Sequence, residues 1–247
     1  MITAVGAVVA ISVWRARALL YRIAGESEQR LNLTRFLPRG VAEDMSDAQL
    51  ARLRAGRRAT LAIMFVDIRG FTNLAERTTP EETARILGRY REIVSDEVER
   101  GRGVVDKFIG DGALAIFGLE GTPGEAARSA IETGEALLAR IAEWDLGGDG
   151  PIRAGVGVHI GEVTVGVVGE ERRLEFTVIG DPVNVAARIE TMTKTTGHAM
   201  LASADVIEAA GAPRREWRDL GDAEVRGRAG GVRLWGYGNA MQGNDYC

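Results

Sequence analysis

The chain has 247 residues, 45% of them hydrophobic and 27% charged, a balance typical of one globular domain with a leader segment. Its formal net charge of -4 gives no electrostatic basis for binding nucleic acid. The single cysteine, Cys247, excludes a disulfide framework, and the only two histidines are too far apart in the sequence to suggest a zinc site. Any metal site must therefore use carboxylates, which suit Mg²⁺ or Mn²⁺.

Residues 1–14 are uncharged and mostly apolar, and three arginines follow by position 22. A complete membrane span needs about 20 apolar residues, so the run is short, but basic residues directly after it are typical of a cytoplasmic flank. A buried helix of a soluble domain is the alternative. We expect residues 1–22 to be a short or partial membrane anchor that holds the cytoplasmic remainder at the inner face of the cell membrane. Residues 23–58 are expected to form a signalling linker helix and the segment before the folded domain.

The run from Leu61 to Val66 is apolar, and it ends on Asp67 and, three residues later, on Gly70. This pattern predicts a strand that is buried on both faces, with Asp67 at the point where the backbone leaves the sheet. Taken alone, Asp67 could equally cap the helix that follows.

Two further apolar runs, residues 104–109 and 113–118, flank Gly110-Asp111-Gly112 and predict a hairpin with Asp111 at its tip. Asp111 by itself could serve only the turn. If the hairpin lies beside the strand at 61–66, however, two carboxylates meet at one end of a sheet. Such an arrangement holds divalent metals against a nucleotide triphosphate.

The other elements follow from capping boxes, helical spacing and apolar alternation. Helices are expected from Pro80 to about Gly101 and from Pro123 to about Trp144, and strands at 153–159, 162–168 and 174–179. A helix from Asp181 to about Thr193, a strand at 198–201, a short helix at 203–210 and a strand-turn-strand at 225–237 complete the chain. This order predicts an α+β fold, a ferredoxin-like βαββαβ core with a C-terminal extension, over residues 59–240.

The second informative run is Thr177 to Arg188, in which Asn184 and Arg188 are four residues apart near the start of the predicted helix. Both side chains therefore lie on one helix face. An amide and a guanidinium near a helix N-terminus suit phosphate and ribose oxygens. An ordinary solvated helix face is the alternative for this run taken alone.

Four segments, FVDIRGFT, DKFIGDGALAIFG, GVGVHIGEV and FTVIGDPVNVAARIE, resemble the signature blocks of the class III nucleotidyl cyclases, in the style of bacterial adenylate cyclases. They occur in the family's order, and the resemblance extends from Ala59 to Tyr237. It implies the class III fold and a lyase that converts ATP to 3′,5′-cyclic AMP and pyrophosphate. It also implies a homodimer with its sites at the subunit interface.

The resemblance also implies residue roles. Asp67 and Asp111 would bind two Mg²⁺ or Mn²⁺ ions per site, with the carbonyl of Ile68 as a further ligand. The amides around Gly70, Phe71 and Thr72 would hold the β- and γ-phosphates of ATP.

Four more residues take roles by the same resemblance. Lys107 and Thr177 occupy the base-selecting positions, Asn184 would orient the ribose, and Arg188 would stabilise the transition state. Lys107 can donate to N1 of adenine and Thr177 can accept from its 6-amino group, which favours ATP, although threonine is the less strict partner.

One position departs from the pattern of some family members, which carry a phosphate-binding arginine before the strand that contains His159. Gly155 stands there in this chain, with Arg153 offset from it. Either Arg226 or Arg228 could bind the triphosphate in its place.

Two other functions remain open at this point, and a third fits the sequence poorly. A guanylate cyclase is the nearest alternative, and a non-catalytic nucleotide-sensing dimerisation domain is a second. A diguanylate cyclase would need Gly-Gly-Asp-Glu-Phe at the hairpin, whereas the related letters here, at 147–151, fall in an inter-helix loop.

Overall fold

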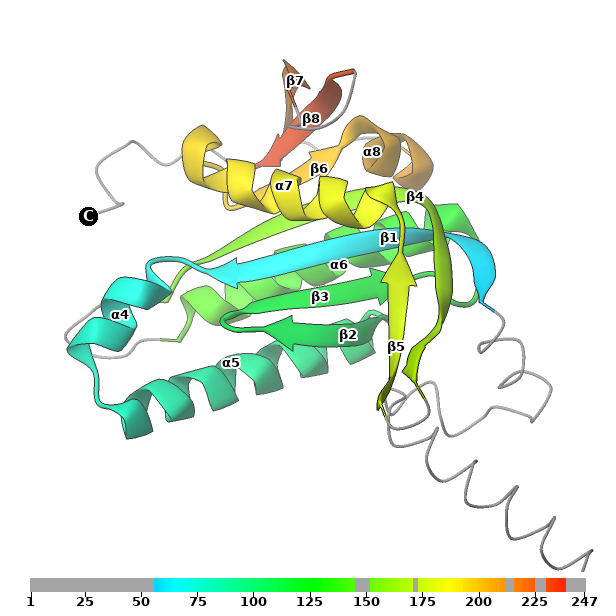
Figure 1. The fold of residues 1–247 in the computed structure, drawn as a ribbon. Coiled ribbons are helices and arrows are strands. Elements are labelled where there is room, and N and C mark those ends of the chain that lie inside the picture. Colours follow the sequence, from blue (N-terminus) through cyan, green and yellow to red (C-terminus); the bar gives the residue numbers. More distant parts are fainter. Residues whose placement is uncertain (1–55, 145–151, 171–172, 212–215, 225–229, 239–247) are drawn as a thin grey trace, which may run out of the picture.

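The structure, a computed structural model, describes residues 56–144, 152–170, 173–211, 216–224 and 230–238 (Figure 1). The predicted anchor at 1–22 and nearly all of the linker lie outside these residues, as do Arg226 and Arg228. No helix in the described ranges combines the length and the apolar character that crossing a membrane requires.

The described chain folds into one mixed eight-stranded sheet with helices on both faces. In chain order its elements are β1 (Arg57–Ile68), α4 (Phe71–Arg77), α5 (Pro80–Arg100), β2 (Val104–Ile109), β3 (Gly112–Phe117), α6 (Pro123–Ala142), β4 (Ala154–Glu170), β5 (Arg173–Ile179), α7 (Asp181–Thr196), β6 (Met200–Ser203), α8 (Ala204–Ala210), β7 (Trp217–Ala223) and β8 (Val232–Tyr237).

Strand β1 is an interior strand of the sheet, whose order is β2-β3-β1-β4-β6-β8-β7, with β5 paired to β4 beside this path. The elements β1, α5, β2, β3, α6 and β4 form a βαββαβ unit in which β1 pairs antiparallel with both β3 and β4. The predicted α+β fold with a ferredoxin-like core is therefore confirmed. The elements that follow β4, from β5 to β8, form the C-terminal extension.

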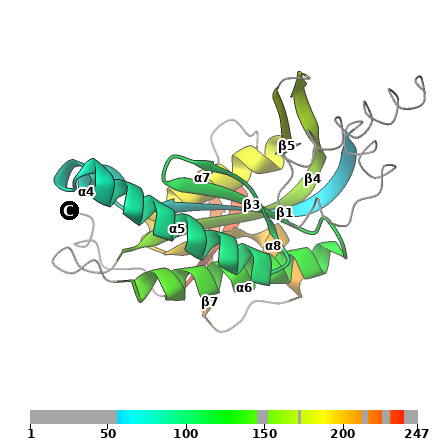
Figure 2. The same ribbon diagram turned by 90° about the horizontal axis from the view of Figure 1, so that it is seen from below.

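Both faces of β1 are buried, as its uninterrupted apolar run predicts. Ala62, Met64 and Val66 belong to the core under α5 and α6, whereas Leu61 and Ile63 belong to the core under α7. Figure 2 shows α5 and α6 together along one side of the sheet and α7 on the other. Side chains alternate between the faces of a strand, so Asp67 continues the set that faces α7.

The two long helices begin at the predicted capping boxes. The hydroxyl of Thr79 accepts a hydrogen bond from the amide of Glu82 at 3.2 Å, and the hydroxyl of Thr122 accepts one from the amide of Glu125 at 3.3 Å. Each cap satisfies an amide that has no partner within the helix, and losing one costs about 1 kcal/mol.

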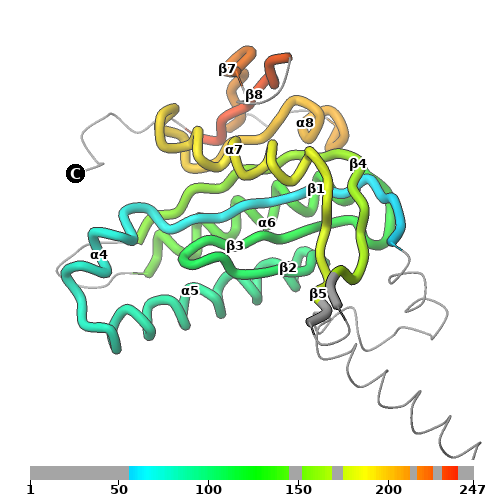
Figure 3. Tube along the Cα trace, viewed as in Figure 1, coloured from blue at the N-terminus to red at the C-terminus, as the bar shows by residue number. Residues whose placement is uncertain are grey.

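The strands predicted at 153–159 and 162–168 are wrong as two elements, because they form the single strand β4. Gly161 does not make a turn but pairs with Leu61 in the middle of the ladder with β1. Its small size has another cause: a Cβ at this position would lie 2.5 Å from the ring of Pro182, so only glycine permits this approach of α7. Strands β4 and β5 then run together as a ribbon past the end of β2 (Figure 3).

The second strand of the predicted final pair is confirmed as β8. Strand β8 pairs with β7, which lies earlier in the chain than the predicted partner. Strand β7 carries Arg218, Asp219 and Asp222 and is interrupted by a register shift before Gly221, so it lacks the alternation that reveals a strand. The predicted partner at 225–229 lies outside the described residues.

Candidate functional site

Asp67 and Asp111 meet at one corner of the sheet. Asp67 is the penultimate residue of β1 and lies opposite Gly112, and Asp111 is in the turn between β2 and β3. Burial raises the pKa of the Asp111 carboxyl, and the neighbouring Asp67 raises it further. The predicted juxtaposition of the two carboxylates is therefore confirmed.

The chemistry of this corner fits a hard divalent cation. Two nearby carboxylates repel one another unless a cation lies between them, and both offer oxygen ligands. Within the described ranges, no group of three or more histidine, cysteine, aspartate or glutamate side chains is arranged to hold a metal. A cation at the two aspartates would therefore need further oxygens, such as the carbonyl of Ile68 and the phosphates of a substrate, which is how proteins usually bind Mg²⁺.

The backbone turns sharply directly after the Asp67 corner. Gly70 has a φ of 65°, in the left-handed region that favours glycine, and it leads from β1 into α4. Phe71 packs against the core under α5, while Thr72 is exposed. The segment Gly70 to Thr72 therefore follows directly after the acidic corner along the chain.

Helix α7 contributes three polar residues to this corner that the sequence did not reveal. Lys194 forms an ion pair with Asp67, with 3.0 Å between Nζ and Oδ2. Glu190 and Thr193 contact Arg69, through an ion pair of 3.6 Å and a hydrogen bond respectively. Burial raises the pKa of Glu190 to about 7, and the charge of Asp67 adds to the increase. The signal in the sequence is their spacing, which places all three on one helix face.

Arg69 fills the space beside Gly155. A Cβ at Gly155 would lie 2.2 Å from Nη2 of Arg69 and 2.7 Å from Oγ1 of Thr193. The position at which the sequence lacks an arginine is therefore next to a guanidinium from the end of β1. The combination of an arginine at 69 with a glycine at 155 is the signal that could have identified this arrangement.

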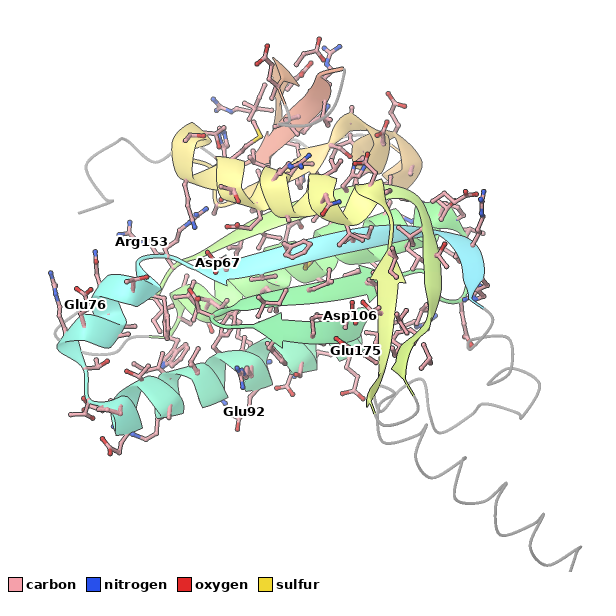
Figure 4. All side chains as sticks on the ribbon, viewed as in Figure 1. Asp67, Glu76, Glu92, Asp106, Arg153 and Glu175 are labelled. Carbon is pink, nitrogen blue, oxygen red and sulfur yellow. The ribbon has the colours of Figure 1, made fainter. Side chains whose placement is uncertain are left out.

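Lys107 and Thr177 form a second polar group, in which each has an acidic partner. Lys107 forms an ion pair with Glu175, and the hydroxyl of Thr177 donates a hydrogen bond of 2.9 Å to Oδ2 of Asp106. Figure 4 shows Asp106 and Glu175 where β5 passes β2, and Asp67 toward the other end of the sheet. The structure thus brings Lys107 and Thr177 together, and the two acidic partners are additions to the predicted set.

Asn184 and Arg188 lie on the first two turns of α7. Asn184 is exposed and Arg188 is half-buried. Asn184 precedes Lys194, the residue that contacts Asp67, by ten positions, which corresponds to about 15 Å along the helix axis. A single chain therefore does not bring Asn184 to the acidic corner.

Comparisons with known proteins agree with this geometry. The model of the adenylate and guanylate cyclase catalytic domain matches residues 53–237. The uncharacterized protein Rv1319c of Mycobacterium tuberculosis is 37% identical over 175 residues, which are 70% of this chain and 32% of that protein. The chain thus spans about a third of the length of this relative.

Two solved structures share the fold. The adenylyl cyclase CyaB from P. aeruginosa has a TM-score of 0.65 and 27% identity, over 76% of this chain and 97% of that one. The guanylyl cyclase Cya2 has a TM-score of 0.66 and 30% identity, over 77% of this chain and 98% of that one. The family match, the sheet order and the paired aspartates lead to one conclusion: the chain belongs to the adenylate and guanylate cyclase catalytic domain family, the class III nucleotidyl cyclases.

Proposed function

We propose that this chain is an adenylate cyclase, which converts ATP to 3′,5′-cyclic AMP and pyrophosphate in sites formed between two copies. The observation that supports this most directly is the pair Lys107 and Thr177, on β2 and β5 where these two strands come into contact, in a domain that also holds Asp67 beside Asp111. Lys107 and Thr177 contact the base, and Asp67 and Asp111 bind the metal ions that hold the triphosphate.

The choice of ATP over GTP rests on hydrogen-bond polarity. The ammonium of Lys107 can only donate, which suits N1 of adenine, whereas N1 of guanine carries a hydrogen. The oxygen of Thr177 can accept from the 6-amino group of adenine. Structural relatives include both adenylyl and guanylyl cyclases. The proposed preference for ATP therefore rests on these two residues and not on the fold.

The interface location is supported by the separation of the two half-sites within one chain. Asn184 is about 15 Å along α7 from the residue that contacts Asp67. Moreover, large exposed apolar side chains lie two residues beyond the base-selecting pair, at Ile109 (56% exposed) and Ile179 (54%). A two-fold pair of copies would cover such side chains and would form two equivalent sites.

The roles of the chain's residues follow from in-line attack of the ribose 3′-oxygen on the α-phosphorus, with pyrophosphate as the leaving group. Two Mg²⁺ or Mn²⁺ ions bound at Asp67, Asp111 and the Ile68 carbonyl would acidify the 3′-hydroxyl and neutralise triphosphate charge. The amides of Gly70, Phe71 and Thr72 hold the β- and γ-phosphates.

On the other half-site, Asn184 holds the ribose in the orientation for attack, and the guanidinium of Arg188 stabilises negative charge on the equatorial oxygens. No side-chain base is needed, because the reaction depends on positioning and on charge stabilisation.

The test is turnover by the purified chain with ATP or GTP and with Mg²⁺ or Mn²⁺, scored for cyclic nucleotide and pyrophosphate. We expect cyclic AMP and pyrophosphate in equal amounts, and a higher kcat/KM for ATP than for GTP. Predominant cyclic GMP would establish the guanylate cyclase alternative. Nucleotide binding with neither product, in every metal, would favour a nucleotide-sensing dimerisation domain.

Attachment to the inner face of the membrane through residues 1–22 is a separate part of the proposal, supported by the apolar run and the arginines after it. Sedimentation with bacterial membranes tests it. The full chain should sediment with the membrane fraction and a chain that begins at residue 23 should not, whereas equal behaviour would contradict attachment through this segment.

A further inference from the structure

The hydroxyl of Thr177 does not by itself distinguish adenine from guanine, because a hydroxyl can donate one hydrogen bond and accept others. If the hydroxyl accepts a hydrogen bond from the base, it suits the 6-amino group of adenine. If it donates one, it suits the 6-oxo group of guanine. In this chain the hydrogen is already committed, since the hydroxyl donates to Oδ2 of Asp106 at 2.9 Å. Only its lone pairs remain for a base.

A bulge in β2 places Asp106 at this hydroxyl. Val105 pairs with Ala115 and Lys107 pairs with Leu114, so Asp106 is an extra residue without a partner on β3. Consecutive residues of a regular strand point to opposite faces, but a bulge re-aims the side chains next to it. Asp106 and Lys107 can therefore both reach β5.

On β5 the two residues that make these contacts, Glu175 and Thr177, are two positions apart and so share one face of the strand. Asp106 contacts Thr177, and Lys107 contacts Glu175. The bulge thus gives each base-selecting residue its own acidic partner.

The charge of Asp106 fixes the direction of its hydrogen bond. Burial raises its pKa to about 6, and the charge of Lys107 and the Thr177 hydrogen bond limit the increase. The nearby Glu175 acts in the same direction as burial. A carboxyl group with this pKa is mainly ionised at neutral pH, and an ionised carboxylate can only accept. Thr177 must then be the donor.

We propose that Asp106 is a positioning residue that fixes the Thr177 hydroxyl as an acceptor toward the base, and thereby favours adenine over guanine. The inference rests on the proposed function, because it concerns the same base site. Guanine would present its 6-oxo oxygen to the lone pairs of Thr177, so Asp106 acts chiefly by excluding the wrong base.

The test is Asp106→Ala, with the ratio of kcat/KM for ATP to that for GTP as the readout. Without the carboxylate the hydroxyl is free to rotate and donate to guanine, so we expect the ratio to fall roughly tenfold. The relative affinities for 2′,3′-dideoxy-ATP and 2′,3′-dideoxy-GTP, which cannot cyclise, should shift in the same direction. Asp222→Ala, which removes an exposed carboxylate on β7, is the matched control and should keep the wild-type ratio.

A double-mutant cycle separates positioning from a general structural effect. In a Thr177→Val background the hydroxyl is absent, so Asp106→Ala should leave the base preference unchanged. If the alanine chain does not fold, Asp106→Val fills the space with a side chain that suits a strand and takes the same measurements.

A folded Asp106 variant with the wild-type ratio would overturn the proposal, and so would an equal shift in the Thr177→Val background. The two dideoxynucleotides also distinguish this proposal from the proposed function. If wild type forms no cyclic product, the cyclase assignment fails, whereas the affinities still decide whether Asp106 sets the base preference.

Discussion

Asp67 lies near both a negative and a positive side chain. The carboxyl of Asp111 is close enough to interact with it unfavourably, and the ammonium of Lys194 is 3.0 Å from its Oδ2. Lys194 therefore compensates part of the negative charge at the acidic corner. Its side chain is 48% exposed, and an exposed ion pair of this kind contributes at most about 1 kcal/mol, so a divalent cation can displace it.

Lys194→Met should therefore strengthen metal binding by about two- to fivefold, because the metal no longer competes with an ion pair worth up to about 1 kcal/mol. Calorimetric titration of the nucleotide-free protein with Mn²⁺ measures this. Arg89→Met, which removes an exposed cation paired with Glu92 on α5, should leave the affinity unchanged. Unchanged or weaker Mn²⁺ binding by a folded Lys194→Met chain would show that the ammonium does not compete with the metal.

Asp67→Asn and Asp111→Asn should each reduce cyclic AMP formation by at least about a hundredfold, since each replaces a charged ligand at nearly constant volume. The fold should persist. The pKa of Asp111 is raised, so its ionised form is disfavoured in the folded chain, and the amide should unfold at the same temperature as wild type or higher at neutral pH.

Activity assays with thermal unfolding check both halves of this prediction. Glu76→Gln, on the exposed surface of α4, is the control for loss of a carboxylate. Near-normal rates for either aspartate variant at modest metal concentration would be incompatible with the two-metal site.

At the scale of elements, the contact between β2 and β5 would set which groups face the base in the site that we propose. Lys107→Glu with Thr177→Cys reverses the hydrogen-bond polarity, so the ATP to GTP ratio of kcat/KM should move toward GTP by at least about tenfold. The new carboxylate would face Glu175, the present partner of Lys107, so Glu175→Gln belongs in both the variant and its reference chain. An unaltered ratio in these chains would mean that the two positions do not contact the base.

The sequence predicts the elements whose residues carry a strong local signal. Strand β1 and the hairpin that bears Asp111 follow from apolar runs and Gly-Asp-Gly, and α5 and α6 follow from their capping boxes. The sequence pattern divides β4 wrongly, because Gly161 resembles a turn residue. The glycine is needed instead for the close approach of Pro182, which is distant in the sequence.

The rest of the candidate site depends on contacts between distant segments. Asp106 reaches Thr177 only because β2 has a bulge and β5 passes close to it. Lys194 reaches Asp67 only because α7 packs over the end of β1. The position of Arg69 in the site is recognised only from its close contact with Gly155 in the folded chain. Local patterns cannot show such contacts, because in the sequence each of these residues resembles any other charged residue.

At the scale of the whole molecule, Asn184 lies about 15 Å along α7 from Lys194, the residue that contacts Asp67, so the two groups of proposed site residues are apart within one chain. Asp67 and Asp111 occupy one corner, while Asn184 and Arg188 are on the far turns of α7. In the homodimer that we propose, the aspartates of one copy would face Lys107, Thr177, Asn184 and Arg188 of the other. Two symmetric sites would result.

Mixing two inactive variants tests this central claim most directly. An Asp67→Asn chain and an Arg188→Ala chain should each be nearly inactive alone. In a mixed dimer, one site would carry both substitutions and the other would carry neither. If the subunits exchange at random, about half of the dimers are mixed and each has one intact site. Cyclic AMP formation should then return on mixing, to about a quarter of the wild-type rate at most. A mixture that stays inactive although subunit exchange is demonstrated would place the whole site within one chain and contradict the shared site.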